Sequence, residues 1–106
     1  MELRRVVITG LGAVTPIGNT LPEYWEALLS GKSGAAPITR FDSSKFKTKF
    51  ACEVKGFAPE EYFERKEARK LDRYSQYGLA AAHQAMVDSR IDVAAVNVDR
   101  AGVIWG

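Results

Sequence analysis

The sequence has few of the residues and runs that mark several classes of protein. Cys52 and His83 are the only members of their kinds, so an intrachain disulfide is excluded. Chains without paired cysteines are typical of the cytoplasm, which is the compartment we expect. One thiol and one imidazole among scattered carboxylates are too few for a zinc shell, and we expect no metal site. The apolar run behind the N-terminal charges is too short for a signal peptide or a membrane span, so we expect no membrane partner.

Charge of one sign is also scarce. The chain carries 15 basic and 13 acidic residues, a net charge of +2. Nucleic-acid binding requires a strongly basic face, so we expect no nucleic-acid partner. Hydrophobic residues make up 46% and charged residues 26% of the chain, as in ordinary globular proteins. The composition therefore predicts a packed core within these 106 residues.

Periodicity and capping signals predict an alternation of strands and helices. Thr20, an early proline and Glu23 have the spacing of a helix N-terminus with a capping box. The expected elements are a buried strand at residues 4–9, a helix at 20–30 with Gly31 as C-cap, an ordered loop at 32–49, a short edge strand or β-arm at 51–57, a helical turn opened by Pro59, a central helical run at 65–89 with a break near Asp72, and a second strand at 100–105.

This order of elements favours an α/β fold. Residues 6–8 form a continuous β-branched run, which is typical of a strand covered on both faces of its sheet. Small residues at 78 and 80–82 predict that the central helix approaches another backbone closely. Two strands alone leave open sheet edges that need pairing, so we expect residues 1–106 to be part of a larger α/β fold.

The segment from Gly10 to Thr15 follows the first expected strand and half-resembles the dinucleotide fingerprint G-x-G-x-x-G. Thr15 stands where the third glycine belongs, and Pro16 and Gly18 interrupt the place where a phosphate-binding helix would start. We therefore interpret the segment as a glycine-rich exit from a buried strand and expect no nucleotide cofactor.

Cys52 and His83 together suggest a nucleophile and a base. However, no helix N-terminus follows Cys52 to activate its thiol, and His83 falls among alanines in the middle of a predicted helix. We interpret both as packing or surface residues and assign no catalytic residue.

A basic cluster lies in the second helical region. Lys66, Arg69, Lys70 and Arg73 follow the spacing i, i+3, i+4 and i+7, which places four positive groups on one stripe of a continuous helix. The residues alone leave two interpretations open, a solvated helix face or a docking surface for an acidic partner.

Three ordered stretches resemble the β-ketoacyl-[acyl-carrier-protein] synthases. They are RRVVITGLGAVTPIGNT at residues 4–20, FDSSKFKTKFA at 41–51 and RKEARKLDRYSQYGLAAAHQAMVDS at 65–89. The third stretch is more similar to the type II elongating enzymes than to type I. The resemblance implies a thiolase-like, five-layered α/β fold, of which residues 1–106 are the first part of the N-terminal half, in a homodimer of longer chains.

The resemblance also implies an activity. Enzymes of this family elongate fatty acids by a decarboxylating Claisen condensation of an acyl-enzyme with malonyl-[acyl-carrier-protein], which gives 3-oxoacyl-[acyl-carrier-protein] and requires no cofactor. Their catalytic cysteine and two histidines correspond to positions beyond residue 106, so the resemblance assigns no catalytic role to Cys52 or His83.

Within this chain the resemblance bears on the basic cluster. Lys66, Arg69 and Lys70 match positions where these synthases present positive charge to the acidic helix of the acyl carrier protein, so docking becomes the favoured interpretation. Arg73 has no counterpart and depends on helical spacing alone. Two alternatives share the opening motifs: a polyketide ketosynthase subunit or domain, and a chain-length factor that does not condense.

Overall fold

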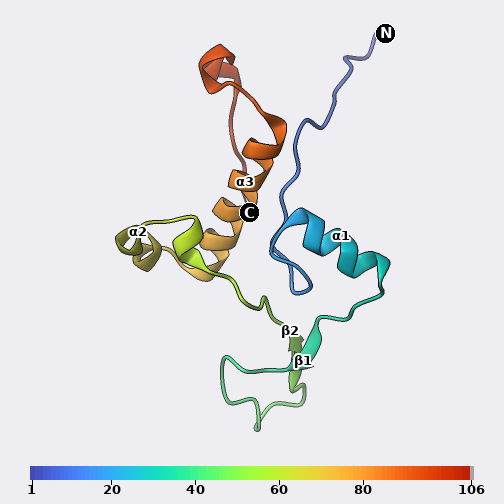
Figure 1. The fold of residues 1–106 in the computed structure, drawn as a ribbon, viewed down its shortest axis with the longest axis vertical. Helices are drawn as coiled ribbons and strands as arrows, with labels where there is room; N and C mark the ends of the chain where they lie inside the picture. The colour runs from blue at the N-terminus through green and yellow to red at the C-terminus, as the bar shows by residue number, and fades with distance from the viewer. Residues whose placement is uncertain (106) are drawn as a thin grey trace.

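The structure is a computed structural model that describes residues 1–105. Figure 1 shows the N-terminal segment descending beside α3 and α1, the two strands forming an arm, and α2 lying at the beginning of α3. In chain order the elements are α1 (Leu21–Leu29), β1 (Ala35–Pro37), β2 (Phe50–Cys52), the 3₁₀ turn η1 (Pro59–Glu61), α2 (Arg65–Lys70), α3 (Arg73–Ser89), and the 3₁₀ turns η2 (Val93–Ala95) and η3 (Val98–Arg100). None of the helices within residues 1–105 is long and apolar enough to cross a membrane.

Helix α1 begins and ends as its sequence predicts. The Thr20 hydroxyl accepts a hydrogen bond from the Glu23 amide, and the Glu23 carboxylate accepts one from the Asn19 amide, one residue earlier than in a standard capping box. Gly31 has the left-handed φ of 68° that ends many helices, and the amide of Lys32 donates to the carbonyl of Ala27 across the turn. The predicted N-cap Thr20 is therefore confirmed, whereas the C-cap is Ser30, one residue earlier than predicted, and the left-handed Gly31 follows it.

The helical run at 65–89 breaks where expected. Helix α2 ends at Leu71, whose backbone is extended, and Asp72 caps α3 by accepting a hydrogen bond of 2.8 Å from the Ser75 amide. That hydrogen bond lowers the pKa of the Asp72 carboxyl. Pro59 opens the turn η1, which confirms the helical turn predicted there.

The two strands are antiparallel, with Ala36 opposite Ala51 at the middle of the register. Strand β2 confirms the beginning of the strand expected at 51–57, and the chain leaves the sheet after Cys52. Strand β1 corrects the prediction of a loop throughout 32–49. Residues 35–37 have no strand signal of their own, and Ala-Ala-Pro is extended there through its pairing with β2.

The strands predicted at 4–9 and 100–105 do not form within the described residues. Residues 4–9 are exposed, and residues 101–105 follow the turn η3 as irregular chain. A strand needs a neighbour to take up its backbone hydrogen bonds, and neither segment is paired with another strand of residues 1–105. The β-branched residues 6–8, which predicted burial on both faces, are exposed in this structure, so that prediction is wrong for residues 1–105.

The close approach predicted for the small residues of α3 is confirmed. A Cβ atom on Gly12 would overlap the Ala81 carbonyl, and one on Gly10 would overlap the Ala85 carbonyl, so only glycine lets residues 10–12 cross the helix at this distance. A hydrogen bond also joins this segment to α3, because the Gln84 side chain accepts one of 3.0 Å from the Ala13 backbone amide. The glycine-rich segment therefore has a packing role in this structure.

The packed core expected from composition is not present. Ala27 and Ala80 are the only buried hydrophobic residues among those described, and the radius of gyration is 17.4 Å, against about 13 Å for a compact domain of this length. Helix α3 was expected to be central, yet only Gln76, Gly78 and Ala80 are buried in it. The residues that would cover its remaining faces are not provided by residues 1–105.

Candidate functional site

The basic residues predicted to form a docking surface lie on α2. Lys66, Arg69 and Lys70 are all exposed, whereas Ala68 is half-buried on the opposite side of the helix. This division follows from helical geometry, because residues 66, 69 and 70 fall within about 100° of one another and residue 68 falls opposite them. The structure therefore brings the three cations together on one accessible face.

A buried amide on α3 fixes α2 in place. Gln76 is 6% exposed, and its Nε2 donates to the carbonyl of Ala68 at 2.9 Å and to that of Leu71 at 3.4 Å. The last carbonyls of a helix have few intrahelical donors. The Gln76 side chain gives the Leu71 carbonyl a donor, and it gives a second donor to the Ala68 carbonyl, which also accepts from the Leu71 amide at 3.3 Å. A helix as short as α2 depends on such tertiary contacts for its stability.

The cations on α2 differ in how far their charge is compensated. Lys70 Nζ lies 3.0 Å from Glu67 Oε1, and both side chains are largely exposed. Neither Lys66 nor Arg69 makes an ion pair within residues 1–105. Among the three predicted docking residues, Lys66 and Arg69 therefore keep their full charge for an acidic partner, with Lys70 partly neutralised.

Arg73 does not join this surface as one continuous helix would require. The break between Lys70 and Arg73 places Arg73 at the first turn of α3. Its guanidinium donates to Gln76 Oε1 at 3.3 Å, which supports the amide that holds α2. The i+7 relation assumed from the sequence is thus wrong, because the extended backbone at Leu71 and Asp72 interrupts the helical phase.

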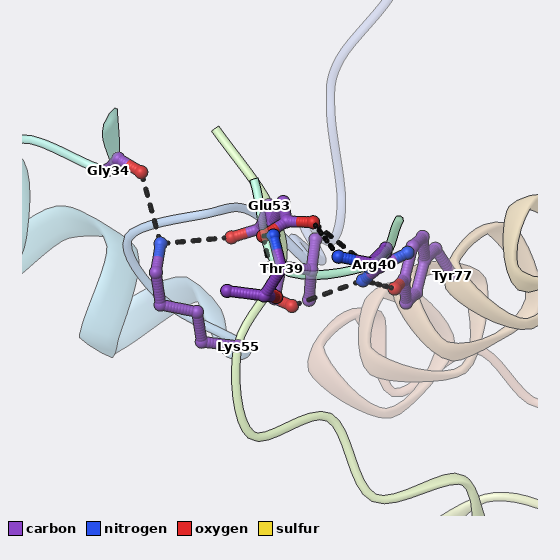
Figure 2. Close-up of polar contacts among 7 residues, drawn as sticks. Gly34, Thr39, Arg40, Glu53, Lys55 and Tyr77 are labelled. Carbon is purple, nitrogen blue, oxygen red and sulfur yellow. Dashed lines mark hydrogen bonds and ion pairs between the residues drawn. The ribbon is translucent and has the colours of Figure 1, made fainter. Parts of the chain in front are cut away.

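A second polar cluster attaches the arm to α3 (Figure 2). Arg40 donates to the Tyr77 hydroxyl at 2.8 Å and to the Val54 carbonyl at 3.2 Å, and its Nε lies 3.7 Å from Glu53 Oε2. The Glu53 carboxylate also accepts hydrogen bonds from the backbone and hydroxyl of Thr39. These contacts fold residues 39–40 back against residues 53–54.

The ionisation of this cluster follows from its contacts. The hydrogen bond to Tyr77 raises the pKa of Arg40 above its ordinary value. Burial acts to raise the pKa of Glu53, but the hydrogen bonds from Thr39 and Arg40 outweigh it, and the pKa of Glu53 is lowered. Both groups are therefore held in their charged forms at neutral pH.

The other candidate residues have structural positions. Cys52 is an exposed free thiol at the end of β2, and His83 lies on the exposed side of α3 with its ring 5.9 Å from that of Tyr62. Between Gly12 and α1 the chain makes a tight turn, in which Thr15 and Gly18 exchange backbone hydrogen bonds. Helix α1 therefore does not start at the glycines, as a dinucleotide-binding helix would.

The residues that position the site could not be recognised from the sequence. Gln76, Arg40 and Tyr77 act through contacts between elements that are far apart in the chain, and no local spacing distinguishes them from solvated polar residues. Gln84 was missed for the same reason, although its Nε2 donates to both the Asn19 carbonyl and the Tyr62 hydroxyl. A polar side chain in the middle of a helix rich in alanine was the one available signal.

Comparison with known proteins places the chain in a family. The family model for the N-terminal domain of beta-ketoacyl synthases matches residues 3–106. The chain therefore belongs to the beta-ketoacyl synthase family.

Individual relatives agree with this assignment. Proteins named 3-oxoacyl-[acyl-carrier-protein] synthase 2 from Synechocystis sp. and Vibrio cholerae are 45% and 49% identical over all 106 residues. The Staphylococcus aureus protein of the same name is 43% identical over 103 residues. In each comparison the chain spans about a quarter of the relative's length (25–26%).

A solved structure shares the fold. The ishigamide ketosynthase/chain length factor matches with a TM-score of 0.76 and 42% identity, over 84% of this chain and 22% of that one. The expected thiolase-like α/β class is thereby confirmed. Residues 1–105 themselves contain one two-stranded sheet and form none of the five layers of that fold as a complete unit.

Proposed function

We propose that the complete protein is a cytoplasmic, homodimeric 3-oxoacyl-[acyl-carrier-protein] synthase of the type II, fatty-acid-elongating kind. Residues 1–106 supply the first part of the scaffold of its N-terminal half. The observation that carries this proposal is the identity of 45–49% over the whole chain to proteins of that name. Identity at this level over all 106 residues supports a shared substrate class as well as a shared fold.

The proposed reaction transfers an acyl group from carrier protein to a cysteine thiolate of the complete enzyme. Malonyl-[acyl-carrier-protein] then loses carbon dioxide, and the resulting carbanion equivalent attacks the thioester carbonyl. The thiolate leaves as the new carbon–carbon bond forms, giving 3-oxoacyl-[acyl-carrier-protein]. None of the 106 residues is assigned to these steps.

The contribution that we propose for this chain is carrier-protein docking by Lys66, Arg69 and Lys70. Their exposure on one face of α2 and the absence of an ion pair to Lys66 or Arg69 within residues 1–105 support this role. Acidic partners are attracted to such a face over a Debye length of about 10 Å at 0.1 M salt.

A second candidate is a polyketide ketosynthase or its non-condensing chain-length factor. The likeness to the ishigamide ketosynthase/chain length factor favours it, at a sequence identity below that of the Synechocystis and Vibrio relatives. The relatives named for 3-oxoacyl-[acyl-carrier-protein] synthesis therefore take precedence.

The test is an assay of the complete enzyme with acyl- and malonyl-[acyl-carrier-protein]. We expect release of carbon dioxide and one round of two-carbon extension. The extension is measured by mass spectrometry of the carrier-bound product. Repeated extension without reduction would favour the polyketide function. A complete enzyme that binds carrier protein but forms no acyl-enzyme would identify it as a chain-length factor.

A further inference from the structure

The loop of the arm concentrates positive charge. Residues 38–50, which we call the arm loop, contain four basic residues and one acidic residue, a net charge of +3. The rest of the chain has eleven basic and twelve acidic residues, a net charge of −1. The net charge of the arm loop, +3, therefore exceeds the net charge of the whole chain, +2.

Three cations of the arm loop form no ion pair within residues 1–105. Arg40 is held by Glu53 and Tyr77, but no ion pair joins Lys45, Lys47 or Lys49 to a carboxylate within residues 1–105. The one acidic residue of the loop, Asp42, accepts a hydrogen bond from the Ser44 amide at 3.0 Å. The three ammonium groups are thus free to attract a negatively charged partner.

Exposed aromatic rings accompany these lysines in the sequence, with Phe46 between Lys45 and Lys47 and with Phe41 and Phe50 on either side. Phe41, Phe46 and Phe50 are 55–64% exposed, and the rings of Phe41 and Phe46 pack edge to face at 5.6 Å. Exposed aromatic rings supply apolar contact at protein–protein interfaces, where phenylalanine is enriched. Lysines around such rings attract and orient an acidic partner.

The arm loop is held in a defined conformation. Its base is closed by the hydrogen bond from the Ile38 amide to the Lys49 carbonyl, and its interior by that from the Phe46 amide to the Ser43 carbonyl. Presenting charges on an ordered loop lowers the entropy lost on binding.

The same turn of α3 anchors both basic surfaces. Gln76 holds α2 through the Ala68 carbonyl, and the next residue, Tyr77, holds the arm through Arg40 (Figure 2). The orientation of the arm base relative to α2 is thereby fixed. Both basic surfaces are therefore attached to neighbouring residues of α3.

We propose that the arm loop is a second docking surface for the acyl carrier protein, in which Lys45, Lys47 and Lys49 contact its acidic side chains. This inference rests on the proposed function, which supplies an acidic protein as the partner. An anionic membrane is the less favoured occupant, because lipid-binding clusters usually contain four to eight basic residues and the arm loop has three unpaired lysines.

The experiment compares three variants of the complete enzyme. The triple variant Lys45→Gln, Lys47→Gln, Lys49→Gln removes the arm charge, and the corresponding triple arginine variant keeps it. A matched control, Lys32→Gln, Arg90→Gln, Arg100→Gln, removes the same charge from exposed positions on other parts of the chain. The dissociation constant for acyl-carrier protein is measured by titration at low salt, and thermal melting verifies that each variant is folded.

We expect the glutamine variant to bind carrier protein about eightfold more weakly, since each exposed ion pair contributes a factor of about two. The arginine variant and the matched control should stay within about twofold of the parent, and the deficit should shrink as salt is added. Turnover of a small acyl thioester should not change.

Two results would overturn the inference while leaving the proposed function intact. One is equal carrier affinity for the arm variant and the matched control. The other is loss of binding to phosphatidylcholine vesicles containing phosphatidylglycerol with carrier affinity unchanged, which would assign the arm loop to a lipid surface. A parent enzyme that neither binds carrier protein nor condenses its acyl groups would instead refute the proposed function.

Discussion

Reversing the charge on α2 tests the first docking surface most directly. In the complete enzyme, Lys66→Glu combined with Arg69→Glu replaces two unpaired cations by two anions, whereas Lys70 is already paired with Glu67 at 3.0 Å. Each attraction lost and each repulsion gained changes affinity by a factor of about two, so the double variant should raise KM for acyl-carrier protein about 15-fold. Each single reversal should raise it about fourfold.

Two substrates separate docking from folding in this experiment. The KM for carrier-bound acyl groups should rise chiefly through slower association and should fall back toward the parent value as salt is added. Activity toward a small thioester, which has no protein surface to dock, should be unchanged. Lys32→Glu combined with Arg90→Glu, on exposed positions away from α2, is the matched control and should leave both activities unaltered.

Two outcomes would contradict a docking role for Lys66 and Arg69. Equal loss of activity toward both substrates, or a markedly lower melting temperature, would show that Lys66 and Arg69 stabilise the fold. Arg69 lies in the last turn of α2, where a cation also interacts favourably with the helix dipole, so a structural contribution has a physical basis.

Three further predictions concern packing and ionisation in the complete enzyme. Cys52→Ala should leave acyl-enzyme formation nearly unchanged and cost about 1 kcal/mol or less of stability, because the thiol is exposed and only packs; loss of the acyl-enzyme in mass spectrometry would show that Cys52 is the nucleophile. Gly12→Ala should lower the yield of folded protein and its melting temperature strongly, because the added Cβ overlaps the Ala81 carbonyl; an unchanged melt would mean that residues 10–12 do not cross α3 this closely. Glu53→Gln should lower the melting temperature at neutral pH by weakening the cluster around Arg40. Folding lowers the pKa of Glu53, so its carboxylate stabilises the folded state fully above the ordinary pKa of 4.5, and this stabilisation is lost as the pH falls through the pKa of the folded state. The melting temperatures of parent and variant should therefore converge in acid. A difference that stays constant with pH would contradict this.

Local signals were sufficient where neighbouring residues decide the structure. Thr20 and Asp72 were predicted as N-caps and are N-caps, and Gly31 has the left-handed conformation directly after the C-cap Ser30, because each is fixed by hydrogen bonds or backbone angles within a few residues. The exposure of Lys66 and Arg69 followed from helical spacing in the same way.

Predictions that required a neighbour from elsewhere in the chain were less successful. The strand at 4–9 had a clear β-branched pattern but finds no partner strand within residues 1–105, while β1 had no pattern and forms because β2 lies beside it. Pairing between strands is a tertiary event, and sequence patterns report only the tendency to take part in it.

The family, the approximate helix boundaries and the three docking candidates Lys66, Arg69 and Lys70 could be predicted from the sequence alone, since all of these depend on ordered motifs or short-range contacts. The presentation of these cations depends on long-range contacts instead. The break at Leu71 and Asp72 takes Arg73 out of the helical phase of α2, and Gln76 and Tyr77 hold α2 and the arm. The physical reason is that a buried amide or a shared hydroxyl acquires its role from partners that are distant in sequence, and no local pattern specifies those partners.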